Sequence, residues 1–300
     1  MISSSTYNFR TVVSLFNGMG TLRQAMHNQN IACDKYYSSE IKDYANKLQE
    51  KHFPDVIQVG DVRNWRSWDI DWSQVDFIGS GSPCQDLSFS GLQAGLSGNK
   101  SSLFWVFVEI LNHAWKHNPN VLFLQENVGS APSIDVGTMS RALGVYPVRI
   151  NSRLVVPQTR NRLYWTNIRT KKDGMFGDLI SDIPQPADRK PLFQDILDHG
   201  TAPYRYSSTL TEREYKNLYK DMDKFKVLLN RCKVKRREIP LHAIDVLGRP
   251  RNLTKSEFCK LQGFPGDYCM NLPIRKTVSL LGDGWTLPII EHILSFISPF

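Results

Sequence analysis

The sequence predicts an α/β protein built on a mostly parallel β-sheet with helices on both faces. Over the first 170 or so residues, short β-rich runs alternate with segments of helical periodicity. Several of these runs stop at a glycine or an acidic residue, as strands of open parallel sheets do where they meet a ligand. The most apolar run, Val121–Leu124, is typical of a central strand buried on both faces.

The first strand is predicted over Thr11–Phe16, and the turn Asn17–Gly20 ends it at once. A helix is expected over Thr21–Gln29, because its apolar residues recur on one face. A strand, a glycine turn and a helix open many cofactor-binding α/β units, where the turn backbone and the helix N-terminus meet the ligand. The pair Gly18 and Gly20 lacks the third glycine of the dinucleotide fingerprint, so this motif has little specificity by itself.

The next elements continue the alternation: a strand at 35–39, a helix at 42–51, and strands at 56–59 and 75–78. Glu40 and Asp61 directly follow two of these strands, at the sheet edge where ligands bind. We expect Glu40 to accept hydrogen bonds from ribose hydroxyls and Asp61 to accept one from an adenine amino group. Standing alone, each could instead be a helix N-cap or an exposed turn acid.

The strand at 75–78 ends in a turn of small residues that leads to Pro83 and Cys84. Pro83 fixes its own φ and keeps Ser82 out of the helical region, so Cys84 follows a stiff, extended loop. A thiol held in this way is a candidate nucleophile. The alternative is an ordinary buried cysteine, since free cysteine is among the most buried residue types.

The remaining elements are a helix at about 100–117, the central strand, and a strand pair at 146–150 and 162–166. Glu126 follows the central strand and places another acid at the same edge. From about Lys171 glycines and prolines interrupt the pattern, which resumes near Leu253. Thr254 and Glu257 form a capping box that opens a short helix, and Pro288 suits the first turn of a last one.

Composition narrows the classes of protein. The five cysteines are scattered without a C-x-x-C pair, which argues against a disulfide framework and a structural zinc site. We expect no metal, no secretion signal and no membrane span.

The net charge is +8, and part of it is concentrated in one block of basic residues without an acid: Lys224, Lys226, Arg231, Lys233, Lys235, Arg236 and Arg237. Such a block is usually a solvated surface, and it is also a candidate for phosphate contacts. Its last residues also resemble, weakly, a nuclear-import patch.

Taken in order, the motifs resemble those of the C5-cytosine DNA methyltransferase family. They span nearly the whole chain: Ser14–Gly20, Glu40, Gly60–Val62, Gly81–Gln85, Glu126–Val128, Gln158 with Arg160 and Arg162, Leu253–Pro265, and Gly282–Trp285. In detail they are most similar to the de novo DNA methyltransferases of animals, and a phage or bacterial relative is a further candidate. The resemblance implies a Rossmann-like S-adenosylmethionine-dependent methyltransferase fold. Residues 1–170 and 253–300 would form the catalytic domain, and 171–252 a small, basic target-recognition domain.

The resemblance also implies the reaction, in which S-adenosyl-L-methionine methylates cytosine at C5 and leaves S-adenosyl-L-homocysteine. Cys84 would add to cytosine C6, Glu126 would hold N3, and Arg162, with Arg160, would hold O2. The base must leave the duplex, because the thiol cannot reach C6 within the stack. The implied cofactor-site residues are Phe16, Asn17, Gly18, Gly20, Glu40, Ile41, Asp61, Val62, Pro83, Asp283 and Trp285. Double-stranded DNA would contact Gln85, Ser88 and the basic block.

Asp283 departs from the family pattern, which usually has Asn at this position. Two alternatives remain open from the sequence. One is a tRNA cytosine-5 methyltransferase of the same fold, whose usual Cys-Phe-Thr signature is absent here. The other is a catalytically silent relative that binds DNA or regulates a partner. The expected location is cytoplasmic and nucleoid-associated in a prokaryote or phage, or nuclear in a eukaryote.

Overall fold

A computed structural model describes residues 7–83, 103–174, 177–211 and 242–297. Cys84 lies outside the described residues. The chain divides into two compact units, which are described separately. The first unit comprises Met1–Ile150, Asn161–Gln185 and Ile290–Phe300, and the second comprises Asn151–Arg160 and Pro186–Ile289.

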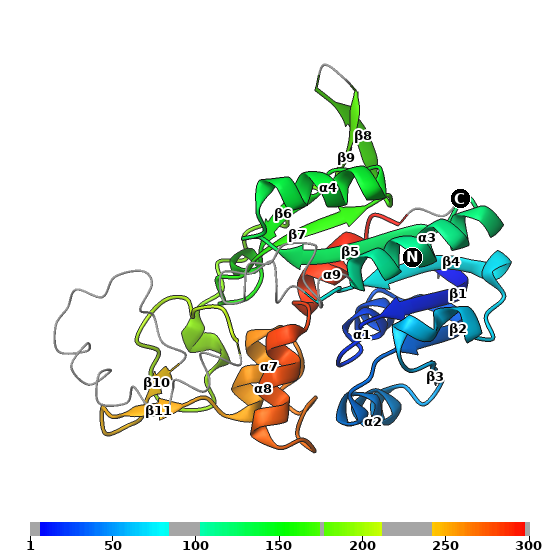
Figure 1. Ribbon diagram of the computed structural model, residues 1–300. Helices are drawn as coiled ribbons and strands as arrows, with labels where there is room; N and C mark the ends of the chain where they lie inside the picture. The colour runs from blue at the N-terminus through cyan, green and yellow to red at the C-terminus, as the bar shows by residue number, and fades with distance from the viewer. Residues whose placement is uncertain (1–6, 84–102, 175–176, 212–241, 298–300) are drawn as a thin grey trace, which may run out of the picture. The chain divides into compact units, whose positions relative to one another are not determined.

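The first unit is organised around a seven-stranded sheet with the order β3-β2-β1-β4-β5-β7-β6. Neighbouring strands from β3 to β5 are parallel, and β7 runs antiparallel to β5. This arrangement confirms the predicted mostly parallel sheet (Figure 1). The strands are β1 (Tyr7–Leu15), β2 (Ile31–Ser39), β3 (Val56–Gln58), β4 (Val75–Ser80), β5 (Leu122–Val128), β6 (Val148–Asn151) and β7 (Asn161–Thr166).

Helices cover both faces of this sheet (Figure 1). On one face Phe107 of α3 and Met139 of α4 share a core with Val13 and Ile78 of the strands. On the other side lies α9, whose Ile293 is fully buried. The helices around the sheet are α1 (Thr21–Asn28), α2 (Asp43–His52), α3 (Leu103–His117), α4 (Ser133–Leu143) and α9 (Leu287–Leu294). None of the helices within the described part of the chain is long and apolar enough to cross a membrane.

Besides shifts of a few residues in strand bounds and a hairpin described below, two features of the first unit differ from the sequence prediction. The central strand β5 does not end at Leu124, because its antiparallel partner β7 continues to pair with it as far as Val128. Glu126 therefore lies inside a strand rather than after one. The helix α4 was not predicted, since it contains Gly137 and several Ser and Thr residues, which favour helix weakly.

The second unit contains a small hairpin and two helices: β10 (His242–Ile244), β11 (Pro250–Asn252), α7 (Lys255–Leu261) and α8 (Ile274–Asp283). As a compact unit it includes 253–289, which the sequence prediction grouped with the catalytic domain. That grouping follows from the family motifs in this segment and stays a prediction. A further hairpin, β8 (Thr170–Asp173) with β9 (Asp178–Ser181), belongs to the first unit.

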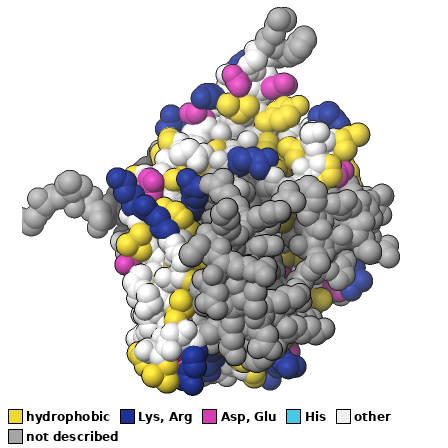
Figure 2. Space-filling view, turned by 90° about the vertical axis from the view of Figure 1, so that its left-hand side faces the viewer, with side chains coloured by type: hydrophobic (Ala, Val, Ile, Leu, Met, Phe, Trp, Pro, Cys, Tyr) yellow, Lys and Arg dark blue, Asp and Glu magenta, His cyan; other side chains and the backbone are white. Residues whose placement is uncertain are grey.

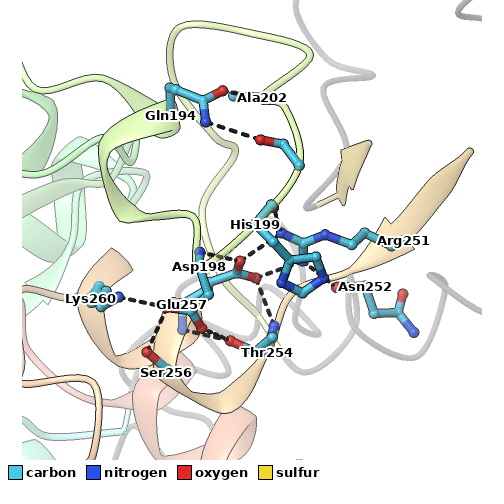
Figure 3. Close-up of polar contacts among 11 residues, drawn as sticks. Gln194, Asp198, His199, Ala202, Arg251, Asn252, Thr254, Ser256, Glu257 and Lys260 are labelled. Carbon is cyan, nitrogen blue, oxygen red and sulfur yellow. Dashed lines mark hydrogen bonds and ion pairs between the residues drawn. The ribbon is translucent and has the colours of Figure 1, made fainter. Parts of the chain in front are cut away.

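A polar network anchors the start of α7 (Figure 3). Thr254 and Glu257 form the predicted capping box, which the structure confirms. Glu257, whose side chain is fully buried, also accepts two hydrogen bonds from the Arg251 guanidinium, at 2.6 and 2.8 Å. Asp198 accepts from Thr254 Oγ1 at 2.6 Å and pairs with Lys260 at 2.6 Å. The network thus joins the loop at Asp198, strand β11 and helix α7.

Replacing Glu257 with Gln should destabilise the second unit by about 3 kcal/mol, because the change leaves the Arg251 charge buried without its counter-ion. Denaturant unfolding checks this value. The control is Asp43→Asn, which breaks an ion pair with Lys47 whose two side chains are 79% and 70% exposed. That change should cost at most about 1 kcal/mol. Equal losses in the two variants would show that burial does not set the contribution of the Arg251–Glu257 pair.

Candidate functional site

The strand register aligns in one row the ends of β1, β2 and β4 and the last residue of β5 that pairs with β4. Leu15 of β1 pairs with Ser39 of β2 and with Ser80 of β4, and Ser80 pairs with Gln125 of β5. The residues that follow this row are Phe16, Glu40, the loop toward Cys84, and Glu126. The sheet therefore brings predicted cofactor residues and predicted catalytic residues to a single edge.

The turn after β1 has an unusual backbone. Phe16 has φ 54°, a left-handed conformation that a bulky residue rarely adopts, and Gly18 and Gly20 have φ 56° and 82°. A Cβ at Gly18 would meet only the Phe16 carbonyl oxygen at 3.9 Å, so the surroundings of this glycine are open. Glycine is needed here for its conformation, and the turn leaves its backbone accessible to a ligand.

Glu40 faces this turn and is 9% exposed. Its Oε2 accepts a hydrogen bond from Gly18 N at 2.9 Å, and its Oε1 accepts from the backbone N–H groups of Ile41 and Lys42, both at 2.8 Å. The carboxylate is thus held in one orientation by three donors. Because each carboxylate oxygen has about two acceptor sites, Oε2 keeps capacity for a further donor such as a ribose hydroxyl.

The neighbouring predicted cofactor residues differ in exposure. The Ile41 side chain is 72% exposed and presents apolar surface beside Glu40, whereas Val62 is buried in the core. Asp61 caps the short helix η1 (Val62–Ser67) by accepting from Arg63 N, and it also pairs with the Arg63 guanidinium. The hydrogen bond from the Arg63 guanidinium lowers the pKa of the Asp61 carboxyl group. The alternative of an N-cap is therefore realised for Asp61, and its contact with adenine stays a prediction.

Asn17 is also among the predicted cofactor residues, but its side chain points into the protein. Its Nδ2 donates to Ser38 Oγ at 2.9 Å and to Gln49 Oε1 at 2.7 Å, and its Oδ1 accepts from Ser14 Oγ at 2.7 Å. The Asn17 side chain thus supports the turn from below. Sequence reasoning did not single out Gln49, because a glutamine inside a helix carries no motif.

The cysteine loop is described as far as Pro83. Ser82, 4% exposed, accepts a hydrogen bond from Gln125 Nε2 at 2.8 Å, and Gln125 is fully buried. The second contact of Gln125 Nε2 is the carbonyl oxygen of Glu126 at 2.8 Å. Gln125 is another residue that the motifs did not indicate, although it immediately precedes Glu126.

Glu126 and Arg162, both predicted to be catalytic, form an ion pair in the first unit. Arg162 Nε lies 2.8 Å from Glu126 Oε1, and the two side chains are 13% and 10% exposed. The pairing follows from the antiparallel register: Glu126 lies opposite Tyr164 and Val128 lies opposite Arg162, so the two residues are diagonal neighbours. The structure thus brings together an acidic and a basic side chain that are 36 residues apart in the sequence.

Arg160 has a different environment, in the second unit. It is 2% exposed, and its Nη2 donates to the carbonyl oxygens of Gly282 and Gly284 at 3.0 and 2.8 Å. These bonds anchor the backbone before Trp285, which is itself buried. Asp283, the departure from the family pattern, is exposed and is the last residue of α8, so the helix extends into the first half of the expected glycine turn and ends there.

The predicted DNA contacts Gln85 and Ser88 and the whole basic block lie outside the described residues. On the face in Figure 2, the described Lys and Arg side chains lie in separate groups, some with an acidic side chain beside them. Among the described ion pairs, Arg169 and Lys171 both pair with Asp182. Within the described part of the chain, no three His, Cys, Asp or Glu side chains form a group that could hold a metal ion.

Comparisons with known proteins agree with this arrangement. The profile of the C-5 cytosine-specific DNA methylase family matches residues 10–141. The Type II methyltransferase M.HpaII of Haemophilus parainfluenzae is 26% identical over 94% of this chain and 87% of its own length. The Type II methyltransferase M.NgoBI of Neisseria gonorrhoeae is 26% identical over 93% of this chain and 90% of its own length.

Among solved structures, the methyltransferase EhMeth of Entamoeba histolytica is similar, with a TM-score of 0.64 and 16% identity. The match covers 96% of this chain and 98% of that chain, which confirms the methyltransferase fold over nearly the whole length. The matched family profile contains the glycine turn, Glu40 and the strand pair β4 and β5 that form the site edge. Its profile match over residues 10–141 and relatives that it spans over nearly their whole length show that the chain is similar to the C-5 cytosine-specific DNA methylase family.

Proposed function

We propose that this protein is a DNA (cytosine-5-)-methyltransferase that uses S-adenosyl-L-methionine and acts through Cys84. The observation that carries the proposal is the pairing of Glu126 with Arg162 on β5 and β7, beside the strand end that leads to Cys84. A carboxyl group and a guanidinium held together beside a candidate nucleophile fit the recognition of a cytosine ring. The printed names of the relatives favour DNA as the substrate.

The residues at the edge of the first unit fit the cofactor. Glu40 has three backbone donors and keeps acceptor capacity for ribose hydroxyls, while Ile41 offers apolar surface for an adenine ring. The open backbone at Gly18 allows close approach. When bound, S-adenosyl-L-methionine supplies an electrophilic methyl group on a sulfonium centre. Trp285, which lies in the second unit, stays a predicted cofactor residue.

The chemistry of the chain's own residues begins with Cys84. Its thiolate forms a bond to cytosine C6, and the electron pair of the C5–C6 double bond moves toward C5 and N3. Glu126, as a carboxylic acid, donates a proton or hydrogen bond to N3. Arg162 donates to O2, where negative charge also develops. After C5 is methylated, a base takes the C5 proton, the C5–C6 double bond re-forms, and the Cys84 thiolate leaves. Any proton that Glu126 gave to N3 returns to Glu126 in this step.

Of the two arginines in the predicted motif, Arg162 fits the role at the base better. It already contacts Glu126, whereas the Arg160 guanidinium is engaged with carbonyl oxygens of the second unit. We therefore assign Arg160 a structural role near Trp285. The reaction requires a cytosine turned out of the duplex, and the basic block supplies the expected phosphate contacts.

Replacing Cys84 with Ser should abolish methyl transfer, because a hydroxyl is a much weaker nucleophile toward C6 than a thiolate. Transfer of tritiated methyl groups to plasmid DNA measures the loss. Duplex binding, followed by fluorescence anisotropy, should stay close to wild type. Methylation at the wild-type rate by this variant would refute the assignment of the nucleophile.

Glu126→Gln should lower kcat by about 10² to 10⁴-fold, the usual contribution of a positioned acid or base, with little effect on cofactor affinity. Steady-state kinetics at saturating cofactor provide the measurement. Glu109→Gln is the control, since Glu109 pairs with Arg66 at an exposed site of the same unit. Similar kinetics for the two variants would show that Glu126 serves structure alone.

Glu40→Gln should raise the Kd for S-adenosylhomocysteine by about tenfold or more, because the amide NH2 replaces one carboxylate oxygen and turns donors toward the backbone N–H of Gly18 or toward those of Ile41 and Lys42. Calorimetric titration measures the change. Glu50→Gln, at an exposed position on α2, should leave the Kd unaltered. Cofactor binding by Glu40→Gln as tight as wild type would exclude Glu40 from the cofactor site.

The nature of the substrate can be tested directly. Bisulfite sequencing of DNA from cells that express the chain should reveal methylated cytosines in a defined sequence context, and purified protein should transfer tritiated methyl groups to duplex DNA in preference to tRNA. Preferential transfer to tRNA would replace DNA with RNA in the proposed function. Cofactor binding without transfer to either would identify a silent relative.

A further inference from the structure

We propose that two buried glutamines, Gln49 and Gln125, are positioning residues, one for cofactor binding and the other for formation of the covalent adduct. Gln49 would fix the turn that binds the cofactor, and Gln125 would fix the loop that carries the nucleophile. The inference rests on the proposed function. It adds two residues that lie outside the motifs and predicts that their effects can be separated.

Gln49, on α2, is the centre of a buried network beneath the cofactor turn. It is 1% exposed, and its Nε2 donates to the carbonyl oxygen of Gly18 at 2.7 Å. Its Oε1 accepts from Asn17 Nδ2 at 2.7 Å and from Ser38 Oγ at 2.8 Å. One side chain thus holds both the backbone and a side chain of the turn, and ties them to the end of β2.

This network bears on cofactor affinity because the turn has a costly backbone conformation. Phe16 and Gly18 both have positive φ, and a non-glycine residue in this region persists only where its surroundings hold it. The Gly18 N–H bonds to Glu40, and the Gly18 carbonyl bonds to Gln49, so both polar groups of this peptide segment have partners. Without Gln49, the Gly18 carbonyl would lose its hydrogen bond. The Gly18 N–H, which donates to Glu40, would then be held less firmly in place.

Gln125, on β5, has a similar role beside the loop that leads to Cys84. Its Nε2 donates to Ser82 Oγ and to the Glu126 carbonyl oxygen, both at 2.8 Å, so it links strand β5 to the loop after β4. Ser82 is separated from Cys84 by Pro83 alone, and Pro83 has a fixed φ. The position of Ser82 therefore constrains where the chain enters Cys84, relative to the strand that carries Glu126.

The burial of both glutamines favours a positioning role over contact with a ligand. Gln125 is fully buried, and its Oε1 has no hydrogen-bond partner among the described residues. A buried amide oxygen without a partner costs free energy, and an apolar side chain in the same place would avoid that cost. The hydrogen bonds from Nε2 to Ser82 Oγ and to the Glu126 carbonyl oxygen then distinguish glutamine from leucine or methionine at this position, and the bond to Ser82 alone reaches the loop after β4.

The experiment compares Gln49→Met and Gln125→Met, which keep similar side-chain volume and remove the amide groups. Cofactor affinity is measured as the Kd of S-adenosylhomocysteine by calorimetry. The covalent step is measured as the rate at which the protein forms a denaturation-resistant adduct with an amplified duplex that carries 5-fluorocytosine at every cytosine, at saturating S-adenosyl-L-methionine. Fluorine at C5 cannot leave as a proton does, so the adduct remains trapped.

Gln49→Met should raise the Kd of S-adenosylhomocysteine about tenfold and change the adduct rate by less than about twofold. Gln125→Met should lower the adduct rate about tenfold and change that Kd by less than about twofold. Each variant is the control for the other, because each removes one buried amide at the same sheet edge. A common decrease in both quantities, or no change in either, would overturn the proposal.

Milder variants keep the test decisive if a methionine variant does not fold. Ser38→Ala removes one partner of Gln49, and Ser82→Ala removes the partner of Gln125. They should shift the Kd and the adduct rate, respectively, in the same directions and by smaller factors. Ser82→Ala combined with Gln125→Met should be no slower than the slower single variant, since both changes remove the same hydrogen bond. Additive losses would contradict the assigned link.

Wild-type protein separates this inference from the proposed function. Wild-type adduct formation supports the proposed function whatever the glutamine variants do. Wild-type cofactor binding without an adduct would refute the proposed function and, with it, the role of Gln125, since no covalent step would exist for that residue to serve.

Discussion

The parallel register of β2, β1, β4 and β5 is the constraint on which the site depends. It places Leu15, Ser39, Ser80 and Gln125 in one row, so that turns far apart in the sequence begin at the same level. Parallel strands present their carboxyl ends together, and the ladder of hydrogen bonds fixes this alignment to within a residue. A slip of one residue in any strand would turn its side chains to the other face and separate the two halves of the site.

Polar side chains are buried just below this edge of the sheet. Most buried donors and acceptors in proteins have a hydrogen-bond partner, and most of the polar atoms described above follow this rule, with Gln125 Oε1 as an exception. Asn17, Gln49 and Ser38 bond to one another, and Gln125 bonds to Ser82, with hydrogen bonds of 2.7–2.9 Å. These bonds support a strained turn and a loop that the apolar core alone would not hold in one conformation.

In the second unit, the Arg251–Glu257 ion pair joins strand β11 to helix α7. The capping box of α7 could be recognised from Thr254 and Glu257 in the sequence, because both members are local. Their partners Arg251 and Asp198 come from a hairpin strand and a loop, and no local pattern indicates them. The same distinction applies to Arg160, whose neighbours Gly282 and Gly284 lie more than 120 residues further along the chain.

The fold class, the order of most strands and helices, and the motif residues can be predicted from the sequence, because they depend on local periodicity and on residues directly at strand ends. The remaining features depend on contacts between distant segments. Pairing with β7 extends β5 through Glu126 and brings Glu126 to Arg162. The fold also turns the Asn17 side chain inward toward Gln49 and places Gln125 within hydrogen-bond distance of Ser82. The physical reason is that hydrogen-bond partners of buried polar groups are chosen by proximity in the folded chain, which strand pairing sets and local sequence does not encode.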